Sequence, residues 1–217
     1  MEDIKLIDMT LKDFGDEVES LSPAPGGGSC AAYSSLVGVC LSRMMANLSF
    51  GKKKFELNDD KIKNEVKLSF EKLKKIKDEL LVLVDKDTLA FNEVVKAMKM
   101  PKETDEEKSL RKDAIEEATW QSIEVPYRVA TLSFEAMKTM YPIYRYGNEN
   151  ALTDVGVAYL MCATGSEGAI LNVKINLGSV IDTQRAKNLE INCNQLLLEL
   201  QTLKNEILNS IHEKLKI

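Results

Sequence analysis

The longest uninterrupted helical pattern of the chain lies between Asp59 and Met100. This stretch has neither proline nor glycine, and its apolar residues recur at spacings of three and four. They are Ile62, Val66, Phe70, Leu73, Ile76, Leu80, Val84, Phe91, Val95 and Met98. A continuous helix of this length spans roughly 60 Å, which exceeds the width of a compact single domain. We therefore expect a helix that protrudes, bends or serves a partner, and that ends before Pro101.

Helical spacing also dominates the rest of the chain. Thr104 and Glu107 have the spacing of a capping box, and Thr10 is placed to cap a short first helix. The expected helices run from Leu11 to Leu21, from about Gly28 to Phe50, from Asp59 to Met100, from Thr104 to Met137, from Thr153 to about Gly178, and from Asp182 to Ile217. The sequence thus predicts an all-α chain, an up-and-down bundle of about six long helices forming one domain over residues 1–217. The heptad-like seam of the last helix fits either packing within the chain or a dimer.

The charge balance of the chain argues against a nucleic-acid partner. Lys and Arg total 29 against 34 Asp and Glu in 217 residues, a net charge of -5, and no basic run is interleaved with aromatics. The longest nearly uncharged stretch, Leu21 to Ser42, is too rich in Ser, Gly and Ala to span a membrane. We therefore expect neither nucleic acid nor a membrane as a partner.

Cysteine usage and the amino terminus indicate a cytoplasmic protein. Cys30, Cys40, Cys162 and Cys193 are scattered without paired spacing, which is typical of reduced core thiols. The segment Met1–Lys5 shows no basic region followed by an apolar stretch, so no signal peptide is expected.

Histidine chemistry is nearly absent from the chain. His212 is its single histidine and lies near the end of a charged helix, where a cation is favourable beside the helix dipole. Without a second histidine or a cysteine pair, the chain lacks the parts of a zinc hydrolase or a Ser-His-Asp triad. Proton transfer would fall to carboxylates, lysines or the substrate, and no metal is expected.

A glycine-rich segment, Pro25-Gly26-Gly27-Gly28-Ser29, stands at the start of the second helical pattern. Its bare backbone and the free N–H groups of a first helical turn suit an anionic ligand, which Ser29 can also contact. The same small residues fit a tight turn that lets two helices pack closely, and the segment alone does not separate the two interpretations. The cluster Lys52-Lys53-Lys54 is by itself typical of a solvated helix end, but together with the glycines it suits a carboxylate- or phosphate-bearing molecule.

Two carboxylates and two amides fall where the helical patterns predict burial. Asp87 stands inside an apolar run, and Asp154 stands at a helix start, where a dipole or capping role is the commoner explanation. Asn172 and Asn176 share one helix face at i and i+4 among apolar neighbours. Because a buried amide is costly unless it is hydrogen-bonded, the pair indicates a site.

Taken in order, these motifs resemble the cyclodeaminase/cyclohydrolase family, over roughly residues 5–190. The family comprises the carboxyl-terminal domain of formiminotransferase-cyclodeaminase and its stand-alone relatives, including methenyltetrahydrofolate cyclohydrolases. The resemblance rests on Pro25-Gly26-Gly27-Gly28-Ser29 with Ala31-Ala32, Gly51-Lys52-Lys53-Lys54, Asp87 with Ala90-Phe91, Met100-Pro101-Lys102, Val125-Pro126, Gly147-Asn148 with Thr153-Asp154, and Asn172-Val173-Lys174-Ile175-Asn176-Leu177. Thr153 replaces the serine expected before the aspartate and keeps the hydroxyl.

The resemblance implies an all-helical, cytosolic homodimer that acts on a one-carbon-substituted tetrahydrofolate, in a cleft near the subunit interface. No metal and no cofactor beyond that folate substrate are implied. In this interpretation Asp87 and Asp154 are the acid and base. The glutamyl tail or pterin carbonyl would bind Gly26, Gly27, Gly28, Ser29, Lys53 and Lys54, and the pterin would bind Asn148, Asn172 and Asn176.

Two reactions fit this interpretation, and one alternative lies outside it. Cyclodeamination of 5-formiminotetrahydrofolate to 5,10-methenyltetrahydrofolate and ammonia is placed slightly ahead of hydrolysis of the methenyl compound to 10-formyltetrahydrofolate. The long helices also fit a noncatalytic helical dimer that binds an anionic ligand or a protein.

Overall fold

The computed structural model describes residues 5–216, and within this range the chain forms helices and no strand. The elements are η1 (Leu6–Asp8), α1 (Leu11–Val18), α2 (Gly27–Asn47), α3 (Lys53–Glu56), α4 (Asp60–Met98), α5 (Asp105–Thr139), α6 (Tyr141–Tyr146), η2 (Glu149–Ala151), α7 (Leu152–Leu177) and α8 (Thr183–Lys214). The predicted all-α bundle is confirmed. Residues 1–4, which bear on the signal-peptide expectation, and Ile217 lie outside the described residues.

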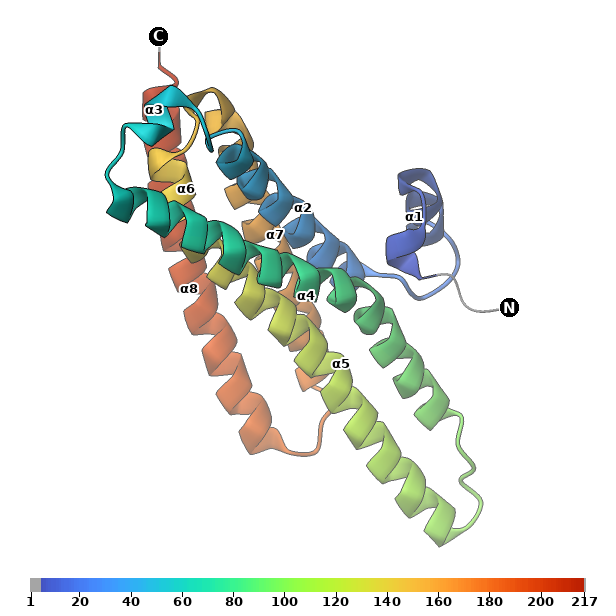
Figure 1. Ribbon diagram of the computed structural model, residues 1–217. Coiled ribbons are helices and arrows are strands. Elements are labelled where there is room, and N and C mark those ends of the chain that lie inside the picture. The colour runs from blue at the N-terminus through green and yellow to red at the C-terminus, as the bar shows by residue number, and fades with distance from the viewer. Residues whose placement is uncertain (1–4, 217) are drawn as a thin grey trace.

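The five long helices are packed side by side, with α2 and α7 at the centre (Figure 1). Helix α2 lies against α7 on one side and α4 on another, and α5 packs on both α4 and α7. Helix α8 covers α7, where it buries Cys193, Leu200, Ile207 and Ile211. The heptad-like seam of the last helix therefore packs within the chain. None of the described helices is long and apolar enough to cross a membrane.

The expected long helix is present as α4, which runs unbroken from Asp60 to Met98. It begins where the Asp59 carboxylate accepts a hydrogen bond from Ile62 N at 2.8 Å. Figure 1 shows that α4 changes direction along its length and that its carboxyl-terminal half projects with the first half of α5 beyond α2. The helix thus bends and protrudes.

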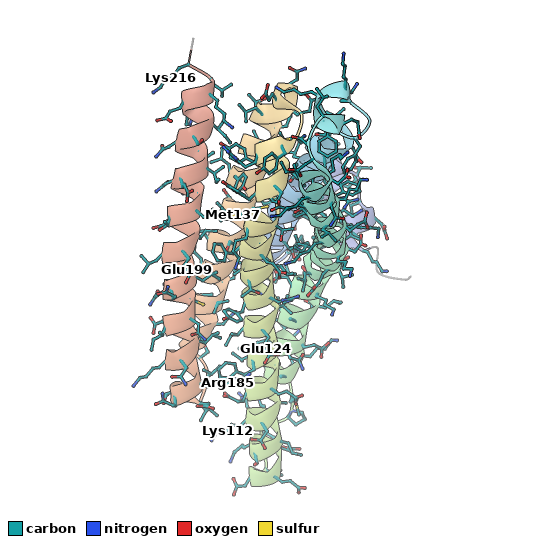
Figure 2. The ribbon with its side chains drawn as sticks, turned by 60° about the vertical axis from the view of Figure 1, so that its left-hand side comes forward. Lys112, Glu124, Met137, Arg185, Glu199 and Lys216 are labelled. Atoms are coloured by element: carbon teal, nitrogen blue, oxygen red, sulfur yellow. The ribbon has the colours of Figure 1, made fainter. Side chains whose placement is uncertain are left out.

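Helix α5 opens on the predicted capping box. Thr104 Oγ1 accepts from Glu107 N at 3.2 Å, and Glu107 Oε2 accepts from Thr104 N at 3.0 Å. Further along, Glu124 Oε1 of α5 accepts from Arg185 Nη2 at 2.7 Å, which joins α5 to the start of α8 (Figure 2). The guanidinium of Arg185 also stacks 3.7 Å from the centroid of the Trp120 ring.

Close approach of α2 and α7 depends on glycines at their contact. A Cβ at Gly38 would lie 2.8 Å from the backbone oxygen of Ala158, and one at Gly165 would overlap Ser35 Oγ and lie 2.5 Å from the backbone oxygen of Ala31. Backbone atoms cannot rotate away from such a contact. The two helices therefore need small residues at these positions.

We expect Gly165→Ala to lower the stability of the fold by about 1–3 kcal/mol, because overpacking forces the two central helices apart. For a chain of this size that corresponds to a Tm lower by about 2–4 °C per kcal/mol, measured by circular dichroism. The matched control is Gly178→Ala at the end of the same helix, where a Cβ meets nothing within 4 Å. Equal Tm values for the two variants would contradict this account of the α2–α7 contact.

Candidate functional site

A cavity of about 360 Å³ lies where the amino-terminal end of α2 meets α4, α5 and the carboxyl-terminal end of α7. It brings together six of the predicted site residues, which come from three separate parts of the sequence: Gly26, Gly27, Gly28, Asp87, Asn172 and Asn176. Asp87 is the one charged residue among those that line it. The glycine segment, the α4 carboxylate and the α7 amides therefore share one site.

Asp87 is partly buried on α4, with its Oδ2 3.3 Å from Ser29 Oγ of α2. Burial raises the pKa of the Asp87 carboxyl, and hydrogen bonds from the side chain and backbone of Ser29 oppose that rise. No ion pair involves Asp87 within residues 5–216. A carboxyl group in such surroundings can hold a proton closer to neutral pH than an exposed aspartate, which suits acid–base chemistry.

The glycine segment makes the space that the Asp87 carboxyl occupies. A Cβ at Gly28 would overlap Asp87 Oδ1 and lie 2.5 Å from Oδ2, and a Cβ at Gly27 would lie 3.2 Å from Asn172 Nδ2. Gly26 is the N-cap of α2 and offers no side-chain cap, so the first-turn N–H groups are left to the cavity or to Asp87. The glycine segment thus permits close packing and also presents the positive end of a helix dipole. Both interpretations that the sequence left open are therefore compatible with its structure.

The two α7 amides are fixed by hydrogen bonds that settle their orientation. Asn172 Nδ2 donates to Gly168 O at 2.8 Å, and Asn176 Nδ2 donates to Ser122 O on α5 at 3.2 Å. No described group donates to the Oδ1 atom of either residue. Each side chain therefore offers a free acceptor at a cavity that contains both residues.

Most of the remaining predicted residues lie elsewhere in the chain. Lys54 and Asn148 line a second cavity of about 410 Å³ at the opposite end of α2, between the α2–α3 and α6–α7 connections. Lys54 Nζ pairs with Glu149 Oε2 at 2.6 Å, and Asn148 Oδ1 accepts from Asn150 N at 3.1 Å. Lys53 is exposed on the short α3 and lines neither cavity.

Asp154 is partly buried in the first turn of α7 and lines neither cavity. Helices α2 and α7 run antiparallel, because Gly27 lies beside Asn172 while Gly38 lies beside Ala158. Asp154 precedes Asn172 by 18 positions on this helix, a rise of about 27 Å. The fold of the single chain therefore does not bring Asp87 and Asp154 into one site.

Several residues of the Asp87 cavity were not predicted. Thr119 and Ser122 of α5 contribute polar groups, and Phe91 and Met98 of α4 contribute apolar surface. Phe91 and Met98 belong to the apolar stripe of α4, so their spacing predicted a core contact. Thr119 and Ser122 carry no sequence signal beyond being small and polar.

A larger groove of about 790 Å³ lies between α4, α5 and α8. It contains none of the predicted site residues and is lined by ionic side chains such as Lys72 and Glu135, which pair at 3.0 Å across it. Volume alone therefore does not identify the functional site. The convergence of a partly buried carboxyl with amides and a helix amino terminus favours the smaller cavity.

Comparisons with known proteins agree on one family. The sequence profile of the formiminotransferase-cyclodeaminase family matches residues 10–195. A methenyltetrahydrofolate cyclohydrolase of Methylorubrum extorquens is 33% identical over 209 residues, covering 94% of this chain and 97% of that protein. The formimidoyltransferase-cyclodeaminase of Mus musculus is 31% identical over 209 residues, covering 96% of this chain but 38% of that protein.

The fold is also known from a solved structure. A formiminotetrahydrofolate cyclodeaminase of Thermotoga maritima superposes with a TM-score of 0.75 and covers 95% of each chain. At 23% sequence identity this similarity shows a shared fold.

Proposed function

The chain belongs to the formiminotransferase-cyclodeaminase family, and from this membership we propose that it is an enzyme of tetrahydrofolate one-carbon chemistry whose site is the Asp87 cavity. The observation that carries the proposal is the cavity itself. It is lined by the Asp87 carboxyl, which has no ion-pair partner among the described residues, by the amides of Asn172 and Asn176, and by the glycine-rich start of α2. We propose that it is a formimidoyltetrahydrofolate cyclodeaminase, which converts 5-formiminotetrahydrofolate to 5,10-methenyltetrahydrofolate and ammonia. The mammalian and avian relatives are named formimidoyltransferase-cyclodeaminase and are proteins of which this chain spans about a third, so their complete activities are not carried over.

Cyclodeamination needs both protonation states of a carboxyl group. N10 of 5-formiminotetrahydrofolate attacks the formimino carbon and forms a tetrahedral carbon between N5 and N10. A base then accepts the N10 proton, an acid protonates the departing nitrogen, and ammonia leaves the 5,10-methenyl cation behind. Asp87 is proposed to serve in this exchange, and its ionised form also stabilises the cation.

The second candidate is methenyltetrahydrofolate cyclohydrolase. Water adds to the methenyl carbon and loses one proton to a base. The new hydroxyl then gives up its proton and becomes the formyl carbonyl, while N5 takes up a proton and its bond to that carbon breaks to give 10-formyltetrahydrofolate. The observation that favours it is the Methylorubrum extorquens relative of similar length, which bears that name. Both reactions pass through a tetrahedral carbon between the same two nitrogens, so the same cavity serves either.

The other groups of the cavity are proposed to hold the folate. The Oδ1 atoms of Asn172 and Asn176 would accept hydrogen bonds from N–H donors of the pterin ring. The first-turn N–H groups of Gly27 and Gly28 would donate to the pterin carbonyl or to the anionic glutamyl tail. The roles of Lys53, Lys54, Asn148 and Asp154 require a second protomer.

We propose a homodimer formed through an uncharged face of α2 and α7. On α7 the face contains Val157, Leu160, Leu171 and Ile175, whose side chains are 44–76% exposed. On α2 it contains the periodic residues Val37, Leu41, Met44 and Leu48, and Ser34 Oγ donates to Met161 O at 2.9 Å at the seam between the helices. An α7 that is apolar nearly all round is typical of a helix covered on every side.

A two-fold axis that crosses the middle of this face at right angles to the helices would pair unlike ends. Gly27, the first residue of α2, and Leu48, its C-cap, are separated by a rise of about 31 Å, with the Asp87 cavity at one end and the second cavity at the other. The second cavity carries Lys52, Lys54 and Arg145 with Glu149, whereas Asp87 is the single charge of the first. The partner subunit's Lys54, Asn148 and Asp154 would thereby approach the Asp87 cavity, and the mostly basic lining of the second cavity would complement the charge of Asp87.

We expect Leu160→Glu to convert the dimer into a monomer at micromolar concentration, because the interface would then bury an unpaired carboxylate. Sedimentation velocity measures the change. Leu198→Glu, a substitution of a 62% exposed residue on α8, is the matched control and should remain dimeric. A wild-type protein that sediments as a monomer would contradict the proposed face.

The proposed reaction is tested by ultraviolet absorbance of the methenyl chromophore. The protein is mixed separately with 5-formiminotetrahydrofolate and with 5,10-methenyltetrahydrofolate and compared with protein-free controls. Growth of the chromophore from the formimino compound, with release of ammonia, supports the cyclodeaminase, and decay from the methenyl compound alone supports the cyclohydrolase. If neither trace departs from its control, the proposed reactions are refuted and the noncatalytic binding protein becomes the leading interpretation.

A further inference from the structure

Ser29 lies outside the cavity that the sequence predicted it to line. Its side chain is fully buried between α2 and α4, with 0% exposure, and it does not contribute to the cavity wall. A substrate in the cavity therefore has no access to the hydroxyl. The Ser29 hydroxyl instead faces α4, where it lies beside the carboxyl group of Asp87.

Three oxygen atoms of α4 surround this hydroxyl. Ser29 Oγ lies 2.8 Å from the backbone oxygen of Val84, 3.3 Å from Asp87 Oδ2 and 3.2 Å from Thr88 Oγ1. Val84 O accepts only, Asp87 Oδ2 accepts when the carboxyl is ionised, and Thr88 can donate to or accept from Ser29. A serine has one proton, so it can make its best hydrogen bond to only one acceptor at a time.

We propose that Ser29 and Thr88 are positioning residues for Oδ2 of Asp87. Their hydrogen bonds change when the Asp87 carboxyl gains or loses its proton. When Asp87 is protonated, Ser29 donates to Val84 O. When Asp87 is ionised, the Ser29 hydroxyl turns to Oδ2, and Thr88 donates to Ser29 Oγ. This inference rests on the proposed function, because Asp87 must change its charge during the reaction.

Two features of the surroundings support this arrangement. Both oxygens of Asp87 lie in the space left by the missing Cβ of Gly28, but Oδ2 also lies 3.3 Å from Ser29 Oγ, so the two oxygens have different neighbours. No charged group of α5 or α7 lines the cavity, and the titratable group coupled to Asp87 on α2 is Cys30, whose pKa is raised by burial and by the Asp87 charge. Among the groups of its own chain, hydrogen-bond donors rather than cations therefore stabilise the ionised carboxylate.

The test is the pH profile of kcat/KM for Ser29→Ala, with the protein-free rate subtracted at each pH. A hydrogen bond to the ionised form lowers a carboxyl pKa, so its removal raises the pKa of Asp87 further. The limb of the profile that reports ionisation of Asp87 should move to higher pH. On that limb, at a fixed pH, kcat/KM should fall about 10-fold, because a hydrogen bond to a charged group is lost. Thr88→Val should move the limb in the same direction by less, and Thr88→Ser should restore it.

The matched control is Ser35→Ala on the same helix. Ser35 is equally buried, its Oγ lies 2.6 Å from Ser133 Oγ of α5, and it stands six positions beyond Ser29, a rise of about 9 Å along α2. This variant should lose stability while its pH profile stays that of the wild type. If Ser29→Ala or Thr88→Val loses stability in the same way without moving the limb, the positioning role is refuted.

The proposed function fails separately, if Asp87→Asn turns over at the wild-type rate. Should Ser29→Ala not fold, Thr88→Val tests the positioning role instead, because Thr88 is only partly buried and its hydroxyl contacts that of Ser29.

Discussion

Asp87→Asn should lower kcat by about 100- to 10,000-fold, the range expected when a positioned acid–base group is removed. Asparagine has nearly the same shape as aspartate and can still accept from Ser29, so the helical fold and the oligomeric state should persist. The measurement is the initial rate of the methenyl absorbance change, with circular dichroism and sedimentation on the same sample. Asp78→Asn is the control, since Asp78 lies on the same helix at the surface, where it pairs with Lys74 at 2.6 Å.

The same variant should be more stable than the wild type at neutral pH. Because burial raises the pKa of Asp87 in the folded protein, the folded state binds the proton more tightly than the unfolded state. The penalty for ionising Asp87 is absent below the unfolded pKa and grows as pH rises towards the folded pKa. Asp87→Asn therefore removes a penalty at neutral pH and removes none in acid, and its gain in Tm should disappear on acidification. A gain that is independent of pH, or a wild-type turnover rate, would contradict the assignment of Asp87.

Gly28→Ala should lower kcat by about as much as Asp87→Asn does. The added methyl group would overlap the Asp87 carboxyl, which must then leave its position beside Ser29 or push α2 away from α4. Overpacking of this kind costs about 1–3 kcal/mol where the neighbour cannot move freely. Activity and urea unfolding are measured on the same preparation.

A double-mutant cycle with Asp87→Ala separates the two consequences. If the methyl group acts only through Asp87, Gly28→Ala should cost little stability once the carboxyl is removed, giving a coupling energy of about 1–3 kcal/mol. Gly15→Ala in α1 is the control, because a Cβ there meets nothing within 4 Å. Additive effects, or a Gly28→Ala variant with wild-type kcat, would show that the glycine does not serve the carboxyl.

Much of the local structure followed from the sequence because local rules decided it. The absence of proline and glycine between Asp59 and Met100 predicted α4, and Thr104 with Glu107 predicted the start of α5. The spacing of Asn172 and Asn176 placed both on one face of α7, and both do line the Asp87 cavity. These patterns depend on helical periodicity and on groups within one turn of each other.

The arrangement of the site residues was harder to predict from the sequence, because it depends on which helix ends meet in the fold. The antiparallel packing of α2 on α7 sends Asp154 and the lysine cluster to the end opposite Asp87, and no short-range pattern reports that direction. Ser29 belonged to a segment that suits a ligand, but the helical rotation that aims its hydroxyl at α4 depends on the packing of Gly28 against Asp87. Side-chain direction near a helix start therefore required the structure.

The central claim is that a one-carbon tetrahydrofolate binds in the Asp87 cavity. Its most direct test is a crystal structure of the Asp87→Asn variant with 5-formyltetrahydrofolate, a stable analogue in which oxygen replaces the imino nitrogen. We predict a pterin ring between the Gly26–Gly28 segment and the amides of Asn172 and Asn176, with the formyl carbon beside residue 87. A folate bound elsewhere on the protein, with this cavity empty, would contradict the account.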